Sequence, residues 1–452
     1  MSSIIYGSIK HKDKSYPFFL EGRRVNIVGA AWECCRDFQN IDEEKSIFGV
    51  TSDNRQILFL KCRFSFSSLY QKVWFYPIGY VLSSGNIGNP YDFTFEKVSF
   101  YSDALNSFYP PQRAISTDFD WKSWDGSMAI KLKPFDETEI SFDYKECTCK
   151  LNVSRYVITQ AGKSNLGNIN AVFSFELKSG IKQSCEELPQ YYLALFDFLS
   201  FINYETNINF DKIVLYKRTE AGFSHCADAY IFSDQGEYLP KSPPNTITVD
   251  DIPLDKLETV FSKIAGLREN DKRLCYYFPK NYKERIRVDA SRWLLKATTF
   301  EGLFRKCYPD FKQNKKEQFR TAKKVALTAL NNIEQKQMSK GEQKYLNDCI
   351  SQVERYEGLL KEIVDFIVKE KYKEELSDLL RANEKEFHLE LNSYGEIYSK
   401  YRNKIAHGDI DPVGEKEWAV YRVLQAVTYF MLFEGTGLSC DTLRTITKKL
   451  FL

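Results

Sequence analysis

The segment GEYLPKSPPNTITVDDIPLD, residues 236–255, separates two parts of the chain that have different hydrophobic periods. Its four prolines break both helices and strands, and such a stretch is typical of an exposed connection. Before it, apolar residues alternate with polar ones; after it, they recur at helical spacing. We therefore predict a first domain at 1–240, a linker at 241–255 and a second domain at 256–452.

The N-terminal part is predicted to be an antiparallel β domain. Segments such as 57–60, 73–76 and 172–175 are short and rich in aromatic and β-branched residues, as strands are. A sandwich or a barrel fits this pattern, and we expect a sandwich-like domain. One amphipathic stretch, 186–203, predicts a helix packed on the sheet.

The C-terminal part is predicted to be an all-α helical bundle, so that the fold class is α+β. Helical periodicity continues through five segments, of which the fourth could be broken: 288–308, 311–335, 340–370, 372–407 and 415–434. The 452 residues are too many for one compact core and suffice for two.

Composition excludes several classes of protein. The 63 basic and 61 acidic residues leave a net charge of +2, so any binding of nucleic acid must come from a local patch. The chain lacks a signal peptide and a run of eighteen apolar residues, which predicts a cytoplasmic protein without a membrane partner. The eleven cysteines lack paired zinc spacing, so we expect reduced thiols, no metal and no cofactor.

The clearest chemical motif lies in residues 392–408, NSYGEIYSKYRNKIAHG. Placed on a helix at about 100° per residue, this segment has two distinct faces. The first is an apolar stripe that consists of Tyr394, Ile397, Tyr398, Tyr401 and Ile405. The second holds the polar and small residues Arg402, Asn403, His407, Gly395, Ser399 and Ala406. Small residues beside a cation, an amide and an imidazole leave room for a ligand or for another helix.

These residue types suit cleavage of RNA without a metal, in which the 2′-hydroxyl attacks the neighbouring phosphate. His407 exchanges protons near neutral pH and would act as general base or acid. Arg402 offers a rigid fork of donors to the charged phosphorane, and Asn403 would orient the imidazole or the phosphate. The sequence thus predicts an endoribonuclease site on one helix.

The string from Arg402 to His407 resembles the motif of HEPN ribonucleases, in which an Arg and a His are separated by four to six positions. Residues 292–304 are similar to an early HEPN helix that contributes an acidic residue, here Glu301. A β-rich region followed by this module looks like ApeA-type HEPN proteins of phage defence. The resemblance implies abortive infection, cleavage of tRNA, and a dimer whose two motif helices form one composite site. From its position and its lack of catalytic motifs, we expect the N-terminal domain to be a sensor or regulatory module, where a phage-derived trigger would bind.

A basic tract between 305 and 324 is the best candidate for RNA binding. It is interleaved with the aromatic residues Phe304, Tyr308, Phe311 and Phe319, which could stack on bases or belong to the core. The basic residues that we assign to RNA are Lys312, Lys315, Lys316, Arg320, Lys323 and Lys324.

Two other classes of function compete with the nuclease. In the first, the helical part is a non-catalytic dimerisation module, the β-rich part binds a ligand, and Arg402 and His407 form a polar interface. In the second, the aromatic strands bind a sugar or a peptide. Growth inhibition on expression, relieved by Arg402→Ala or His407→Ala, would distinguish the nuclease from both.

Overall fold

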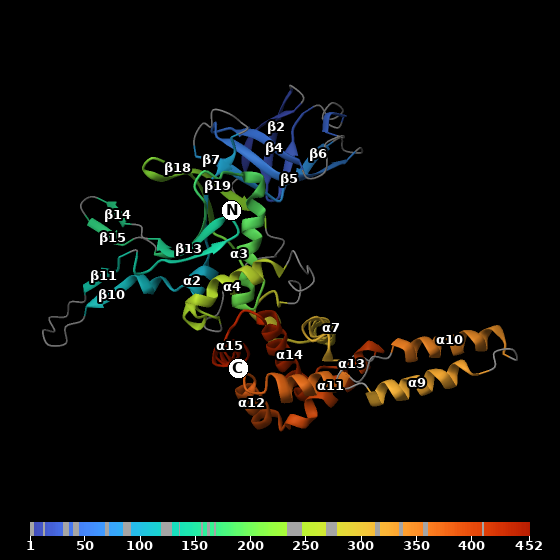
Figure 1. Ribbon diagram of the computed structural model, residues 1–452. Coiled ribbons are helices and arrows are strands. Elements are labelled where there is room, and N and C mark those ends of the chain that lie inside the picture. Colours follow the sequence, from blue (N-terminus) through green and yellow to red (C-terminus); the bar gives the residue numbers. More distant parts are fainter. Residues whose placement is uncertain are drawn as a thin grey trace. The chain divides into compact units, whose positions relative to one another are not determined.

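The computed structural model has two compact units, Met1–Tyr282 and Lys283–Leu452 (Figure 1). It describes residues 4–11, 14–29, 36–38, 45–67, 72–84, 92–118, 129–134, 136–154, 157–160, 163–166, 169–232, 246–267, 278–311, 317–333, 338–355, 360–408 and 411–452. The first unit is rich in antiparallel strands and the second is helical, so the predicted α+β class is confirmed.

The N-terminal unit begins with a closed antiparallel barrel. Its strands pair in the order β5-β4-β1-β2-β3-β6, and pairing between β5 and β6 closes the ring. The strands are β1 (Ile5–His11), β2 (Lys14–Glu21), β3 (Arg24–Ile27), β4 (Lys45–Thr51), β5 (Gln56–Ser67) and β6 (Lys72–Tyr76). Alternate side chains such as Phe18, Val25, Phe59 and Phe75 fill the interior.

Strand β5 also starts a long open sheet that extends from the barrel. Residues Ile57–Leu60 of β5 pair with β7, whereas Arg63–Ser67 pair with β6. Lys61, between the two halves, has a positive φ of 43°, and the register with β4 shifts there, as at a β-bulge. The sheet continues through β7 (Gly79–Ser83), β19 (Gly222–Ile231), β18 (Lys212–Thr219), β9 (Lys97–Tyr101), β16 (Asn170–Leu177), β13 (Cys147–Ser154) and β12 (Ile140–Tyr144). Strands β1 to β6 therefore form a barrel, the other of the two arrangements that the strand pattern allowed beside a sandwich.

Helices α2 (Asp103–Phe108), α3 (Leu188–Asn203) and α4 (Leu254–Ala265) pack on this sheet. The ring of Phe261 in α4 stacks on Phe173 at 5.4 Å, and Tyr191 in α3 meets Phe175 at 5.2 Å. The helix predicted at 186–203 is thus confirmed, and it lies against the sheet. Because α4 belongs to the N-terminal unit, helical residues beyond the proline-rich stretch still contribute to the first core.

Several short elements complete this unit. Two hairpins pair β10 with β11 and β14 with β15, and β8 pairs with β17. Their bounds are β8 (Thr94–Phe95), β10 (Ile115–Asp118), β11 (Ala129–Leu132), β14 (Val157–Gln160), β15 (Lys163–Leu166) and β17 (Gln183–Ser184). Short 3₁₀ turns occupy Pro111–Ala114, Cys185–Glu187 and Val249–Asp251.

The C-terminal unit is built around α14 (Glu415–Phe433), which is buried from Ala419 to Phe433. Packed on it are α7 (Ala290–Cys307), α12 (Ser377–Phe387), α13 (Tyr394–Ala406) and α15 (Cys440–Phe451). The predicted break within 372–407 is confirmed, since His388 leaves α12 with a positive φ of 51°. The other helices are α6 (Tyr282–Ile286), α9 (Glu317–Asn331), α10 (Lys340–Arg355) and α11 (Leu360–Phe366), with a π turn at Ile367–Lys371 and a 3₁₀ turn at Leu391–Ser393.

Within the ranges that the structure describes, no helix is long and apolar enough to cross a membrane. The cysteines in these ranges are free thiols, and Cys62, Cys149 and Cys185 are buried among apolar side chains. Burial raises the pKa of all three thiols, so they remain protonated and unreactive. In the same ranges no three His, Cys, Asp or Glu residues lie close enough to hold a metal ion.

Candidate active site

Helix α13 carries the motif, and its apolar face anchors it in the bundle. The predicted stripe is confirmed: Tyr394, Tyr398, Tyr401 and Ile405 are buried, and Ile397 is half-buried. These positions share one side of a helix, so their burial turns the motif residues toward the opposite side. The polar face is thereby held in a defined orientation.

Helix α7 provides the surface on which α13 packs. The indole N–H of Trp293 donates to the backbone carbonyl of Glu417 at 3.1 Å, which fixes this ring beside the first turn of α14. The Trp293 ring lies 5.5 Å from that of Tyr398 and 5.0 Å from that of Tyr401, centroid to centroid. This aromatic contact brings the middle of α13 beside the turn of α7 that carries Glu301.

Glu301 and Arg402 form an ion pair at this crossing, as expected for an acidic residue near the motif. The Nε of Arg402 donates to Oε1 of Glu301 at 3.1 Å, and Nη2 donates to Oε2 at 3.4 Å. The hydroxyl of Tyr398 donates to the same Oε1 at 2.9 Å. The carboxylate therefore accepts three hydrogen bonds, two of them from a fork that sets the plane of the guanidinium.

The two partners differ in their exposure to solvent. The side chain of Glu301 is 8% exposed and that of Arg402 is 30% exposed. A buried carboxylate needs a cation and donors, and Arg402 and Tyr398 provide them. In the part of the chain that the structure describes, Nη1 of Arg402 has no protein acceptor. One edge of the guanidinium is thus fixed, while the other is available to an anionic ligand.

Tyr398 is a site residue that the sequence did not reveal. Burial and the adjacent Glu301 carboxylate hold the pKa of Tyr398 well above its usual range, so the hydroxyl remains a donor. The residue was assigned to the apolar stripe, and its ring does pack in the core. The sequence signal that could have revealed this role is the position of the tyrosine, one helical turn before Arg402.

His407 and Asn403 are exposed and lie at the C-terminal end of α13. His407 occupies the cap position, with φ −90° and ψ 1°, and Gly408 follows with a φ of +94°. Gly408 therefore ends the helix as a glycine cap. Among the described residues, neither the imidazole of His407 nor the amide of Asn403 bonds to another side chain. The structure thus joins Glu301 to Arg402. It leaves the side chains of Asn403 and His407, on the same helix as Arg402, open to solvent.

The small residues of α13 have different surroundings. A Cβ added to Gly395 would lie 2.5 Å from the carbonyl oxygen of Lys361 and 2.8 Å from Oδ1 of Asp365. Gly395 therefore serves the close packing of α13 against α11. Ser399 is half-buried and Ala406 is exposed. The end of the helix that carries Asn403, Ala406 and His407 is exposed and accessible to a ligand or to another helix.

Lys296 is a second residue that sequence analysis did not select. It lies on α7, is 4% exposed, and its burial lowers the pKa of the ammonium to about 7. A buried lysine costs stability when it is charged, and the helix on which it lies also carries Glu301. The sequence gives no sign of this burial, because a lysine on an amphipathic helix ordinarily faces solvent.

The basic tract predicted to bind RNA is only partly visible. Lys312, Lys315 and Lys316 lie outside the described residues, and Arg320 belongs to α9 without a described side chain. Lys324 is exposed and Lys323 is half-buried. Phe304 is buried and packs against Tyr308 and Phe311, which favours the core assignment for these rings. The assignment of the basic residues to RNA remains a prediction.

Comparisons with known proteins identify the N-terminal region. Residues 20–244 match the family model described as ApeA N-terminal domain 1. This range contains most of the barrel and the whole of the open sheet with α3. The chain therefore has an ApeA-like N-terminal region, in agreement with the predicted resemblance. Neither a curated protein nor a solved structure matches the chain.

Proposed function

We propose that this protein is a phage-defence effector whose C-terminal unit is a HEPN-type endoribonuclease. The ApeA-like N-terminal region supports the role in defence. The main support for nuclease activity is the geometry of Arg402. The buried carboxylate of Glu301 holds one edge of its guanidinium, and the helix that carries it ends at His407. We propose that its substrate is RNA, and we expect tRNA in particular.

In the proposed reaction, the 2′-oxygen of one nucleotide attacks its own 3′-phosphorus. His407 as general base removes the 2′-hydroxyl proton, and the free edge of Arg402 stabilises the negative charge of the phosphorane. The bond from phosphorus to the 5′-oxygen then breaks, and that oxygen receives a proton. The products are a 2′,3′-cyclic phosphate and a 5′-hydroxyl. Asn403, one turn before His407, would orient the imidazole or the phosphate.

This reaction needs both a proton acceptor and a proton donor, while each chain supplies one His407. A dimer that pairs the exposed ends of two α13 helices would provide two imidazoles, one for each role. The exposure of Ala406, Asn403 and His407 is compatible with such pairing. We therefore propose a homodimer with a composite site. The N-terminal unit would act as the sensor that responds to a phage-derived trigger.

The test is incubation of the purified full-length protein with total RNA and a metal chelator, followed by mapping of the ends. We expect cyclic phosphate ends, and loss of cutting in Arg402→Ala and His407→Ala. Lys400→Ala is a matched control for the first variant, because Lys400 is an exposed cation of α13 that pairs with Glu396. His388→Asn is the control for the second, since asparagine tolerates its left-handed backbone.

An inactive resting enzyme must be distinguished from a protein without activity. Expression during phage infection supplies a trigger, and host growth with RNA integrity gives the readout. Cutting that survives His407→Ala would overturn the assigned role of this residue. Intact RNA in infected cells, with wild-type protein present, would favour the alternative of a non-catalytic dimer that binds a ligand.

A further inference from the structure

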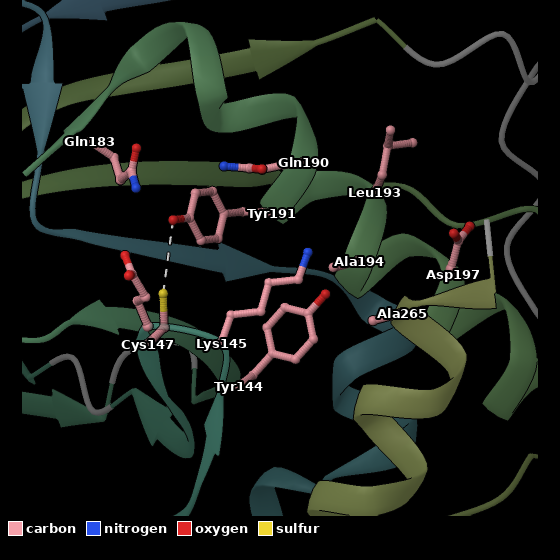
Figure 2. A pocket seen from close by; sticks show the side chains of 11 residues that line it. Tyr144, Lys145, Cys147, Gln183, Gln190, Tyr191, Leu193, Ala194, Asp197 and Ala265 are labelled. Carbon is pink, nitrogen blue, oxygen red and sulfur yellow. Dashed lines mark hydrogen bonds between the residues drawn. The ribbon is translucent and has the colours of Figure 1, made fainter. Parts of the chain in front are cut away.

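A second chemically equipped site lies in the N-terminal unit, in a pocket of about 420 Å³ (Figure 2). It is bounded by the turn between β12 and β13, by α3, and by the end of α4. Its volume falls within the range of small-molecule sites, roughly 300–1,000 Å³. Its lining is mainly apolar, and a few polar groups converge on it, as in binding sites for flat organic molecules.

Two tyrosines provide aromatic surface in this pocket. Tyr144 comes from the end of β12 and Tyr191 from the first turn of α3, and both line the pocket while less than a tenth exposed. Such rings favour a planar ligand, which can pack on their faces or edges. The hydroxyl of Tyr191 accepts from the Cys147 thiol at 3.8 Å, and burial raises the pKa of Tyr191. The Tyr191 hydroxyl therefore keeps its hydrogen and can donate it to a ligand acceptor.

Two glutamines supply the pairs of donors and acceptors that a heterocycle would use. Gln183 lies on β17 and Gln190 on the first turn of α3, and both side chains line the pocket on the side of Tyr191 (Figure 2). Each amide has two donors and one acceptor oxygen and can pair with the edge of a base. Two such edges beside two aromatic rings match the chemistry of a nucleobase.

Lys145 occupies the turn in a conformation that lysine rarely adopts. Its φ is 53°, in a two-residue turn between the paired residues Tyr144 and Cys147, where glycine is favoured. The ammonium lies 5.4 Å from the centroid of the Tyr144 ring, and Figure 2 shows the side chain extending toward α3. A strained residue that lines a pocket points to a role in binding.

The charges of the lining indicate a neutral ligand. Lys145 is accompanied by two acidic residues, Glu146 and the buried Asp197, so the lining has no excess of cations. A phosphate group would meet these acidic side chains, whereas a sugar hydroxyl could donate hydrogen bonds to them. We infer that the pocket binds a nucleoside, whose base lies beside the tyrosine rings and the glutamine amides. This site is independent of the nuclease proposal, because it is tested by binding alone.

The experiment measures binding of adenosine, guanosine, cytidine and uridine to the full-length protein by calorimetry and thermal shift, with the 5′-monophosphates in parallel. We expect saturable binding of at least one nucleoside, tighter than that of its monophosphate. Gln190→Ala should weaken binding roughly threefold to tenfold through the lost hydrogen bonds. No binding of any nucleoside, or tighter binding of the monophosphates, would overturn the inference.

Lys145→Gly provides a sharper variant, because glycine relieves the backbone strain while the ammonium is lost. It should raise the Tm of the free protein and weaken nucleoside binding. Asn54→Gly is its matched control: Asn54 also has a positive φ, of 64°, but lies in the turn between β4 and β5. This control should leave binding unchanged. If Lys145→Gly and Gln190→Ala both bind nucleosides as the wild type does, the pocket is not the site.

Discussion

The guanidinium of Arg402 and the carboxylate of Glu301 meet across 101 positions of sequence, with Nε and Oε1 3.1 Å apart. The pair connects two helices of the C-terminal unit and leaves part of the guanidinium exposed. Its energetic contribution depends on that exposure, because water screens the solvent-facing side of the cation. Four variants of residues on these two helices, α7 and α13, test how the helices are packed in the bundle.

Glu301→Gln keeps the shape of the side chain and removes its charge. We expect the free energy of unfolding to fall by about 1 to 3 kcal/mol, less than for a fully buried pair because Arg402 reaches solvent. Urea denaturation measures the change. Glu396→Gln, which alters an exposed pair with Lys400, is the control and should leave the free energy of unfolding nearly unchanged. Equal losses for the two variants would contradict the described burial.

Tyr398→Phe removes one hydroxyl and retains the packed ring. The lost hydrogen bond to Glu301 should lower the unfolding free energy by about 1 to 3 kcal/mol, since the acceptor is charged. Because Glu301 also holds Arg402, cleavage of RNA should slow without a comparable change in KM. Initial rates of RNA cleavage at several substrate concentrations give kcat and KM for both proteins. An unchanged kcat would show that Tyr398 supports only the fold.

Gly395→Ala should destabilise the protein by roughly 1 to 3 kcal/mol, because the added methyl group meets the backbone oxygen of Lys361. Gly302→Ala is a natural control on α7, where a Cβ would find open space. That change should stabilise the helix by about 0.5 to 1 kcal/mol. Thermal melts of both variants would show shifts of opposite sign.

Lys296→Met tests the buried ammonium through pH. The pKa of Lys296 is lowered to about 7 in the folded protein, so the unfolded chain binds more protons between pH 7 and the ordinary lysine pKa. Stability of the wild type should therefore rise with pH across this window, relative to Lys296→Met. The difference between the proteins should shrink by roughly 3 to 4 kcal/mol from pH 7 to 10.5. A pH-independent difference would show that the ammonium is solvated.

Much of the helical architecture could be predicted from sequence, because a buried stripe repeats within a few residues. The stripe of Tyr394, Tyr401 and Ile405 is such a local signal, and the glycine cap after His407 is another. The contact of Glu301 with Arg402 was expected only through the resemblance. Its geometry could not be derived, since periodicity orients a helix without setting how far it slides along its neighbour.

The β unit was less predictable, because strand pairing joins distant residues. The alternation of apolar residues predicts strands for either a barrel or a sandwich. Closure of the barrel depends on β5 pairing with different partners on either side of Lys61, and no local pattern marks that position. The buried positions of Lys296 and the hydroxyl of Tyr398 escaped for a similar reason. Both residue types are ordinarily assigned by their usual exposure.

Strand β5 gives the N-terminal unit a property that neither the barrel nor the open sheet would have alone. One continuous backbone supplies hydrogen bonds to both, so the barrel cannot open along β5 without disturbing the strand that pairs with β7. The two should therefore melt in one transition. Any molecule that separates the barrel strands at β5 would also disturb the pairing of β5 with β7, so a change in the barrel would alter the open sheet.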